Sequence, residues 1–409
     1  MRPKFSKSGA QKKWGSAGLL CNRLMATSSM NTLELFDRLI GFPTVSRDSN
    51  LDLIDFVSAF LQERSASVRL FKSSDGKKAN LYATIGPREN AGVLLSGHSD
   101  VVPVDGQDWQ SNPFKLTQRA GSMYGRGTAD MKGFLACALS AADRASRLTL
   151  HRPLHLAISY DEEIGCVGVR SLIKDMQSWT AHPTVCIVGE PTLMKVAVGH
   201  KGKTALKVTC TGHSVHSALA PQGINAIHLA SDLVQRLRTM QDFLEKSGTH
   251  DPGYEVPYTT VHVGRLIGGT ALNIVPDRCQ MEVEIRNVSR DAPAQFIERI
   301  RTFAAEIERQ VRRPEIQAGI SVEITNEYPG LNTSESAEVA NFVSGLAGDE
   351  DRIRVAFGSE AGLFSGIGIP TVLCGPGSIV HAHRPNEFIA EDQLARCDTM
   401  MNRLLKKLS

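Results

Sequence analysis

The chain has 409 residues, of which 42% are hydrophobic and 22% are charged, and its formal net charge is +3. This length exceeds what one hydrophobic core usually serves, so a single small domain is excluded and two domains are expected. Six of the 46 basic residues and no acidic residue lie in residues 1–30, so the remainder is mildly acidic, which argues against nucleic acid as a partner.

The amino-terminal segment, residues 1–29, is basic and rich in serine and small residues, which superficially resembles an organelle transit peptide. We favour a simpler interpretation, in which translation starts at Met25 or Met30 and residues 1–29 are disordered or a mis-assigned start. No apolar stretch has the length of a membrane span. Eight cysteines without a Cys-x-x-Cys spacing predict reduced, buried thiols in a cytoplasmic protein.

The first chemically informative element is the short apolar strand that begins at Leu94 and ends in His98, with Asp100 two residues further on. Side chains alternate along a strand, so His98 and Asp100 project to the same side. Asp100 can then accept a hydrogen bond from the ring nitrogen that a metal does not use. His98 is therefore the first candidate metal ligand.

Further polar residues follow the next predicted elements. Asp130 lies in a glycine-rich loop before a helix that begins near Phe134. The other candidates are Asp161, Glu162 and Glu163 after a strand at 154–159, Glu190 after a strand at 183–188, and His381 and His383 near the carboxyl end.

Each of these residues taken alone is more often a solvated loop residue than a ligand. Open sheets in which strands alternate with helices gather their strand ends along one crevice, however, so His98, Asp130, the acidic pairs and a late histidine can converge. Two histidines and three or four carboxylates suit a pair of hydrolytic zinc ions bridged by one carboxylate.

A composition shift marks a second domain between residues 201 and 325. The predicted order is strand 204–211, helix 224–240, strand 260–266, strand 278–286, helix 292–310 and strand 320–324. This β-α-β-β-α-β unit predicts a four-stranded antiparallel sheet with both helices on one face. The expected domains are therefore residues 30–198 and 326–409 for the catalytic domain and 199–325 for the insert.

Several motifs together carry a family resemblance. They are Gly41-Phe42-Pro43-Thr44-Val45-Ser46, the segment Gly125-Arg126-Gly127-Thr128-Ala129-Asp130-Met131-Lys132-Gly133, Gly189-Glu190-Pro191-Thr192, and Gly375-Pro376-Gly377-Ser378 with His383. With these motifs the chain after Met30 resembles the dinuclear-zinc amidohydrolases and exopeptidases, a family that includes acetylornithine deacetylase, succinyl-diaminopimelate desuccinylase and glutamate carboxypeptidase. The resemblance implies an α/β fold, with an open mixed-sheet catalytic domain and a ferredoxin-like insert that serves as lid and dimerisation domain.

The resemblance also implies roles for the candidate ligands. His98, Asp130 and Glu190 would hold one Zn²⁺, and Asp130, Glu163 and His383 the other, with Co²⁺ as an alternative metal. Asp130 would bridge the two ions, and Glu162 would be the general base. His383 is preferred to His381 because the family places its ligand directly before a basic residue.

Four more residues are assigned in the same way. His216 would stabilise the oxyanion in the active site of the partner subunit, whereas His213 is expected to be a surface residue. Asn273 and Arg286 would hold the substrate α-carboxylate. Glu360 would face a side-chain ammonium of the substrate, or it is simply an acid favoured at a helix amino terminus.

Within the family the chain is most similar to the acetylornithine deacetylases. The expected activity is hydrolysis of N2-acetyl-L-ornithine to L-ornithine and acetate in arginine biosynthesis, by a cytoplasmic homodimer that contacts neither membranes nor nucleic acid. Another N-acyl amino acid is the alternative substrate, with removal of an acetyl or a succinyl group. A different class of function, a non-catalytic binding module on the same fold, is disfavoured because every ligand and the base are present.

Overall fold

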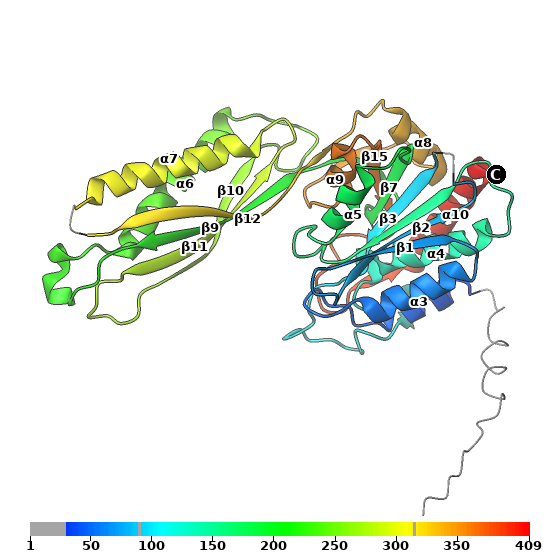
Figure 1. Ribbon diagram of the computed structural model, residues 1–409, viewed down its shortest axis with the longest axis horizontal. Helices are drawn as coiled ribbons and strands as arrows, with labels where there is room; N and C mark the ends of the chain where they lie inside the picture. Colours follow the sequence, from blue (N-terminus) through cyan, green and yellow to red (C-terminus); the bar gives the residue numbers. More distant parts are fainter. Residues whose placement is uncertain (1–29, 89–90, 314–315) are drawn as a thin grey trace, which may run out of the picture.

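The computed structural model describes residues 30–88, 91–313 and 316–409, so the predictions for residues 1–29 lie outside the described residues. Figure 1 shows two lobes joined side by side. The small lobe is formed by the described residues of the range 202–328, from the start of β9 to the end of β12, and the large lobe by the described residues before and after this range. The chain therefore leaves the large lobe once and returns to it once.

The large lobe is built on a mixed sheet. Its strand order is β1-β2-β6-β3-β7-β15-β8-β13, and β14 pairs with β8. The bounds are β1 Ser67–Lys72, β2 Ala79–Ile85, β3 Val93–His98, β6 Leu154–Ser159, β7 Val185–Pro191, β8 Val196–His200, β13 Leu331–Asn332, β14 Arg352–Val355 and β15 Thr371–Gly375. The central strands β3, β6 and β7 are almost wholly buried apolar runs, as expected for parallel strands that are covered on both faces.

Helices cover both faces of this sheet (Figure 1). One face packs against α2 Thr32–Ile40, α3 Leu51–Gln62, α4 Gly133–Ala145, α8 Glu338–Ala347 and α10 Glu391–Leu408. The other face packs against α5 Val169–Met176 and α9 Ala361–Gly366. Leu95 belongs to the first core and Leu94 to the second, so the alternation along β3 places Ser96 and His98 on the α5 and α9 side.

The parallel pairing of three strands positions the candidate ligands. β3 pairs in parallel with both β6 and β7, with Leu94 opposite His155 and Cys186. The carboxyl ends of these strands therefore lie at one edge of the sheet, where His98 ends β3, Glu162 and Glu163 follow β6, and Glu190 lies in β7. A small sheet of β4 Thr117–Arg119, β5 Ser122–Tyr124 and β16 Phe388–Ala390 joins the carboxyl-terminal segment to the loop before Asp130.

The small lobe has the predicted alternation of strands and helices. Its strands pair antiparallel in the order β10-β11-β9-β12. The elements are β9 Gly202–Thr211, α6 Ala226–Ser247, β10 Thr260–Gly268, β11 Arg278–Asn287, α7 Pro293–Val311 and β12 Gly319–Tyr328. Both helices contribute to one core with the inward strand residues. The predicted fold class, an open mixed sheet with a ferredoxin-like insert, is confirmed.

Most observed bounds differ from the predicted ones by one to a few residues, and α6 differs most. It begins after Asn225, whose side chain accepts hydrogen bonds from the backbone N–H groups of Ile227 and His228, and it ends at Ser247 instead of the predicted Met240. Beyond Met240 the buried face is continued by Leu244, four residues further on.

Two general expectations can be compared with the described residues. The cysteines in this part of the chain, which exclude Cys21, are all buried and form no disulfide. None of the helices in residues 30–88, 91–313 and 316–409 is both long and apolar enough to span a bilayer.

Candidate metal centre

The first ligand-type side chain, His98, is buried at the end of β3. Its Nε2 atom lies 2.9 Å from Oδ1 of Asp130. Its Nδ1 atom lies 2.8 Å from the main-chain oxygen of Asp100, whereas the Asp100 carboxylate is 3.6 Å away. Asp100 is therefore the partner of His98 as predicted, but the closer contact is made by its carbonyl group and not by its carboxylate.

The Asp100 carboxylate supports the loop that follows β6. Its Oδ1 atom accepts a hydrogen bond from the backbone N–H of Glu162 at 3.2 Å, and its Oδ2 atom accepts one from Glu163 at 3.3 Å. Ser46 Oγ donates to the same Oδ2 atom at 2.7 Å. A buried carboxylate that accepts several hydrogen bonds holds this acidic loop in place.

Asp130 lies between the two histidines, in the turn Thr128–Lys132 before α4. One of its oxygens faces His98, and the other lies 3.1 Å from Nε2 of His383. The same His383 nitrogen lies 3.0 Å from Oε2 of Glu163. His381 instead packs against Phe388, with ring centroids 4.1 Å apart and the rings tilted by 32°. The structure therefore brings His383, the preferred late histidine, to the acidic cluster.

The ligand-type atoms form two groups that share Asp130. His98, Asp130 and Glu190 make one group, and Asp130, Glu163 and His383 make the other, with the atoms of each group within 4.8 Å of one another. The Oε1 atom of Glu190 is buried and has no hydrogen-bond partner among the described residues. Two histidines and three carboxylates that converge in this way match the donor set of a dinuclear zinc site.

The electrostatics of the cluster also fit a pair of cations. Burial raises the pKa of Glu162 to about 8 and that of Glu163 to about 7, and neighbouring carboxylates add to both shifts. Burial also raises the pKa of Glu190 far above its usual range, with Asp130 as the next cause. Hydrogen bonds to Asp130 and Glu163 raise the pKa of His383 to about 10. So many acids in one buried place need positive charge nearby, and divalent metal ions supply it.

A cavity of about 130 Å³ opens beside these groups, between the two lobes. Its lining includes Asp130, Glu162, Glu163, Glu190 and His383 from the large lobe. Lys203, Arg286 and Tyr328 line it from the base of the small lobe. Glu162 thus faces the same cavity as the metal groups but belongs to neither of them.

The predicted carboxylate-binding residue Arg286 lies in this cavity in a fixed orientation. Its guanidinium donates to Glu284 at 2.8 Å and to the hydroxyl of Tyr328 at 3.0 Å. Lys203 is directly opposite Arg286 on β9, and Tyr328 is directly opposite Lys203 on β12. Sequence reasoning missed Lys203 and Tyr328. The two-residue alternation of side chains along β9 is the signal that could have placed Lys203 on the same face of the sheet as Arg286.

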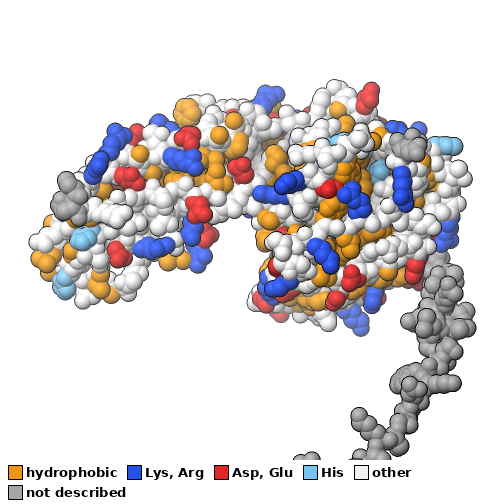
Figure 2. All heavy atoms as spheres, viewed as in Figure 1, with side chains coloured by type: hydrophobic (Ala, Val, Ile, Leu, Met, Phe, Trp, Pro, Cys, Tyr) orange, Lys and Arg blue, Asp and Glu red, His pale blue; other side chains and the backbone are white. Residues whose placement is uncertain are grey.

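The other two small-lobe residues, His216 and Asn273, are brought together elsewhere. Backbone contacts join His216 to Ile274 and the N–H of Ser217 to the carbonyl oxygen of Asn273. They lie beyond the Thr211 end of β9, whereas Lys203 at its other end lines the cavity. Eight residues of strand separate these ends by roughly 26 Å. Figure 2 shows histidine side chains exposed at the end of the small lobe that lies away from the large lobe.

Glu360 lies buried in the large lobe. It is 1% exposed, and its oxygens accept hydrogen bonds from Ser96 Oγ at 2.6 Å and Ser159 Oγ at 2.7 Å. The residue precedes α9 and reaches into the sheet beneath His98 instead of lining the cavity. Both carboxylate oxygens are used inside the fold, which favours the alternative interpretation of Glu360 as an acid at the amino terminus of α9, and the ammonium contact stays a prediction.

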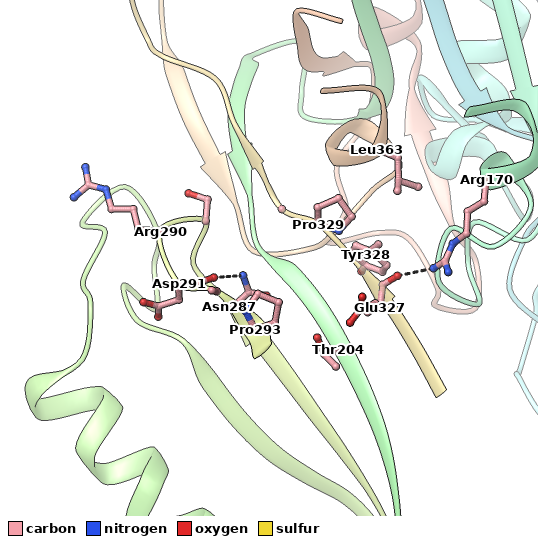
Figure 3. Close-up of a pocket in the computed structure, with 13 residues that line it drawn as sticks. Arg170, Thr204, Asn287, Arg290, Asp291, Pro293, Glu327, Tyr328, Pro329 and Leu363 are labelled. Atoms are coloured by element: carbon pink, nitrogen blue, oxygen red, sulfur yellow. Dashed lines mark hydrogen bonds between the residues drawn. The ribbon is translucent and has the colours of Figure 1, made fainter. Parts of the chain in front are cut away.

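A second cavity, of about 580 Å³, lies at the junction of the lobes, as Figure 3 shows. Thr204 and Asn287 line it, whereas their sequence neighbours Lys203 and Arg286 line the metal-site cavity, so the two cavities lie on opposite faces of the small-lobe sheet. Tyr328 lines both. None of the predicted site residues lines this junction cavity, so its greater volume does not mark it as the reaction site.

Comparison with known proteins agrees with this geometry. Residues 94–407 match the model of peptidase family M20/M25/M40. The chain is 33% identical to an acetylornithine deacetylase from Pasteurella multocida (strain Pm70), over 91% of this chain and 97% of that protein. It is 34% identical to an acetylornithine deacetylase from Myxococcus xanthus, over 89% of this chain and 94% of that protein.

Solved structures of low sequence identity share the fold. An M20 family metallo-carboxypeptidase from Sulfolobus solfataricus superposes with a TM-score of 0.73 at 19% identity, covering 92% of this chain and 99% of that chain. A dinuclear metal-binding peptidase of the M20 family from Bacillus subtilis superposes with a TM-score of 0.65 at 16% identity, covering 92% of this chain and 97% of that chain.

Proposed function

The chain belongs to peptidase family M20/M25/M40, and from this premise we propose that it is a metal-dependent amidohydrolase that cleaves N2-acetyl-L-ornithine to L-ornithine and acetate. The observation that carries the proposal is the convergence of two metal-sized groups on a shared Asp130, with Glu162 beside them in one cavity. The acetylornithine deacetylases among its relatives support the choice of substrate.

The proposed metal ions are two Zn²⁺ per subunit, with Co²⁺ as the alternative. His98, Asp130 and Glu190 would hold one ion, Asp130, Glu163 and His383 would hold the other, and Asp130 would be shared. When bound, such a pair polarises an amide carbonyl and lowers the pKa of a water molecule. Oxygen and imidazole ligands accommodate several divalent metals, so metal analysis of the purified protein decides between them.

Glu162 is the proposed general base. It lines the cavity without belonging to either group of ligands, so its carboxylate is free to take a proton from water and pass it to the leaving amine. The backbone of Glu162 is held in place by the hydrogen bond that its N–H donates to the Asp100 carboxylate. Asp100 therefore acts as a positioning residue for the acidic loop.

Arg286 is the proposed contact for the substrate carboxylate. Glu284 and Tyr328 hold its guanidinium toward the cavity, and Lys203 adds a second cation on the same wall. A fixed guanidinium binds a carboxylate with defined geometry. The two cations also favour the alternative substrate class, N-succinyl amino acids, whose acyl group carries another carboxylate.

We also propose that residues 199–325 form a lid and join two subunits into a homodimer. His216 and Asn273 lie beyond the Thr211 end of β9, which is itself roughly 26 Å along the strand from Lys203 at the cavity, so a role in catalysis requires the partner's cavity. The exposed apolar side chains Leu272 and Ile274 lie next to them, and β10 is an open edge of the sheet. An exposed apolar edge of this kind is suited to pairing with a second copy.

Complementation between two inactive variants tests this shared site. Glu162→Gln removes the base of one subunit, and His216→Ala removes the lid contribution of the other. Mixing them after reversible dissociation should restore about a quarter of wild-type turnover, because about half of the dimers are then mixed and each contains one intact site. A mixture that stays as inactive as its components would refute the sharing of His216.

A substrate panel tests the activity itself. Purified protein loaded with Zn²⁺ or Co²⁺ is assayed with acetylornithine and with acetylated and succinylated amino acids, and bound metal is measured in parallel. Two ions per subunit with highest kcat/KM for acetylornithine support the proposal, whereas preference for a succinylated substrate supports the alternative. A protein that binds no metal and releases no acid would be a binding module. The proposed setting is arginine biosynthesis in the cytoplasm, where the buried, unpaired cysteines stay reduced.

A further inference from the structure

A buried ion pair lies directly behind the proposed metal ligands. Arg126 and Glu387 are each 1% exposed, and Nη1 of Arg126 lies 2.6 Å from Oε2 of Glu387. An ion pair taken fully out of water is costly unless further hydrogen bonds satisfy both partners, so its other contacts show what it does.

Glu387 uses its second oxygen to hold the loop of the shared ligand. Its Oε1 atom accepts hydrogen bonds from the backbone N–H groups of Ala129 at 2.9 Å and Asp130 at 3.2 Å. The backbone of Glu387 is fixed as well, because its carbonyl oxygen accepts from the N–H of Gly125 and the next residue pairs with Tyr124. The side chain therefore connects the carboxyl-terminal segment to Asp130.

Arg126 holds the segment that carries the other ligand. Its guanidinium donates to the carbonyl oxygen of Arg384, next to His383, at 3.3 Å and to Oε1 of Gln107 at 2.6 Å. Gln107 in turn donates through Nε2 to the carbonyl oxygen of His383 at 3.1 Å. His383 has a φ of +63°, a strained conformation for a residue other than glycine, so it needs such restraint.

From these contacts we infer that Arg126 and Glu387 are a positioning pair that sets the separation of Asp130 from His383 and so assembles the proposed second metal group. The pair touches neither the cavity nor the ligand atoms, so it acts through the backbone of the two loops. The inference rests on the proposed metal pair. Asp100 makes the equivalent contacts with the backbone of Glu162 and Glu163, which shows that the fold uses the same device twice.

Metal titration of apo-protein tests the inference without reference to turnover. Glu387→Gln keeps one acceptor oxygen but removes the charge and places an amide donor near Arg126. The ion held by Asp130, Glu163 and His383 should then bind about tenfold or more weakly, as is typical when a residue behind a ligand is lost. The first ion should be affected less, because His98 and Glu190 do not contact the pair. The visible absorption of bound Co²⁺ reports the changed geometry of the second site.

Two further variants keep the test decisive. Gln107→Ala removes the link between Arg126 and His383, together with the hydrogen bond that Gln107 accepts from Trp109 Nε1, and leaves the buried pair intact, so it should fold and still weaken the second ion. Asp143→Asn is the control, because Asp143 pairs with Arg64 in the same lobe, is also buried at 6% exposed, and has no hydrogen bond to a ligand loop among the described residues. This control should bind both ions as the wild type does.

The outcomes separate this inference from the proposed function. If Glu387→Gln and Gln107→Ala bind two ions with wild-type affinities and unchanged Co²⁺ spectra, the pair is merely structural and the inference is wrong. If Glu387→Gln does not fold, the result for Gln107→Ala alone decides. A wild-type protein that binds two ions but cleaves no N-acyl amino acid would contradict the proposed function and leave the inference in place.

Discussion

Replacing Glu162 with glutamine tests the proposed chemistry most directly. The substitution keeps the shape of the side chain and removes only its ability to take a proton. The side chain accepts one weak hydrogen bond, from Sγ of Cys166 at 3.2 Å, while its backbone is held by Asp100, so the loop should not move. Because burial and neighbouring acids raise the pKa of Glu162 to about 8, a neutral residue should be tolerated without metal.

The expected loss can be stated as a free energy. A positioned general base contributes typically 10²- to 10⁴-fold, which corresponds to about 3–5 kcal/mol in the activation barrier. The assay measures acetate release under saturating acetylornithine, with bound metal determined on the same sample. Glu162→Gln should retain two ions and lose turnover, whereas Glu163→Gln should lose an ion as well. Turnover within about tenfold of wild type, with both ions bound, would refute the assignment of the base.

Three other predictions concern stability and specificity. Burial lowers the pKa of His200 to about 4, so the unfolded chain binds a proton at this side chain before the folded protein does. Up to about 3 kcal/mol of stability, present above pH 6.5, should therefore be lost as the pH falls toward 4. Urea unfolding in EDTA should show a smaller loss for His200→Asn. Glu360→Gln should destabilise the fold by about 1–3 kcal/mol yet leave the preference for acetylornithine over acetylnorvaline unchanged. A reduced preference would show that Glu360 contacts the side-chain ammonium of the substrate. Gly189→Ala should destabilise by about 1–3 kcal/mol, because its Cβ would lie 2.0 Å from the ring of Phe134, whereas Gly345→Ala, in open space on a helix, should stabilise by about 0.5–1 kcal/mol in the same melting assay.

Much of the fold follows from local patterns. The predicted strand at residues 154–159 has the observed bounds, because a short, mainly apolar run between polar loops is typical of a buried strand. The insert was also predictable, since its helices and strands follow periods that each segment shows by itself. The end of α6 was missed because its last turns are mainly polar and only the packing of Leu244 shows that the helix continues.

The candidate site, like the fold, was predictable from the sequence only in part. That His98, Asp130, Glu163, Glu190 and His383 meet could be expected from the sequence, because residues that follow parallel strands emerge at one edge of a sheet. Their roles as ligands remain predictions that metal analysis decides.

By itself, the sequence determined which elements form, which chemical groups emerge near the crevice, and to which family the chain belongs. Only the tertiary structure decided how particular side chains are used. The Glu360 carboxylate accepts hydrogen bonds from two buried serines. The Asp100 carboxylate accepts hydrogen bonds from the backbone of the acidic loop, and the Glu387 carboxylate accepts them from the backbone of the loop that carries Asp130. The physical reason is that a strand's period determines the side to which a residue points, whereas its hydrogen-bond partner comes from a segment far away in the chain, which only the packed fold brings near.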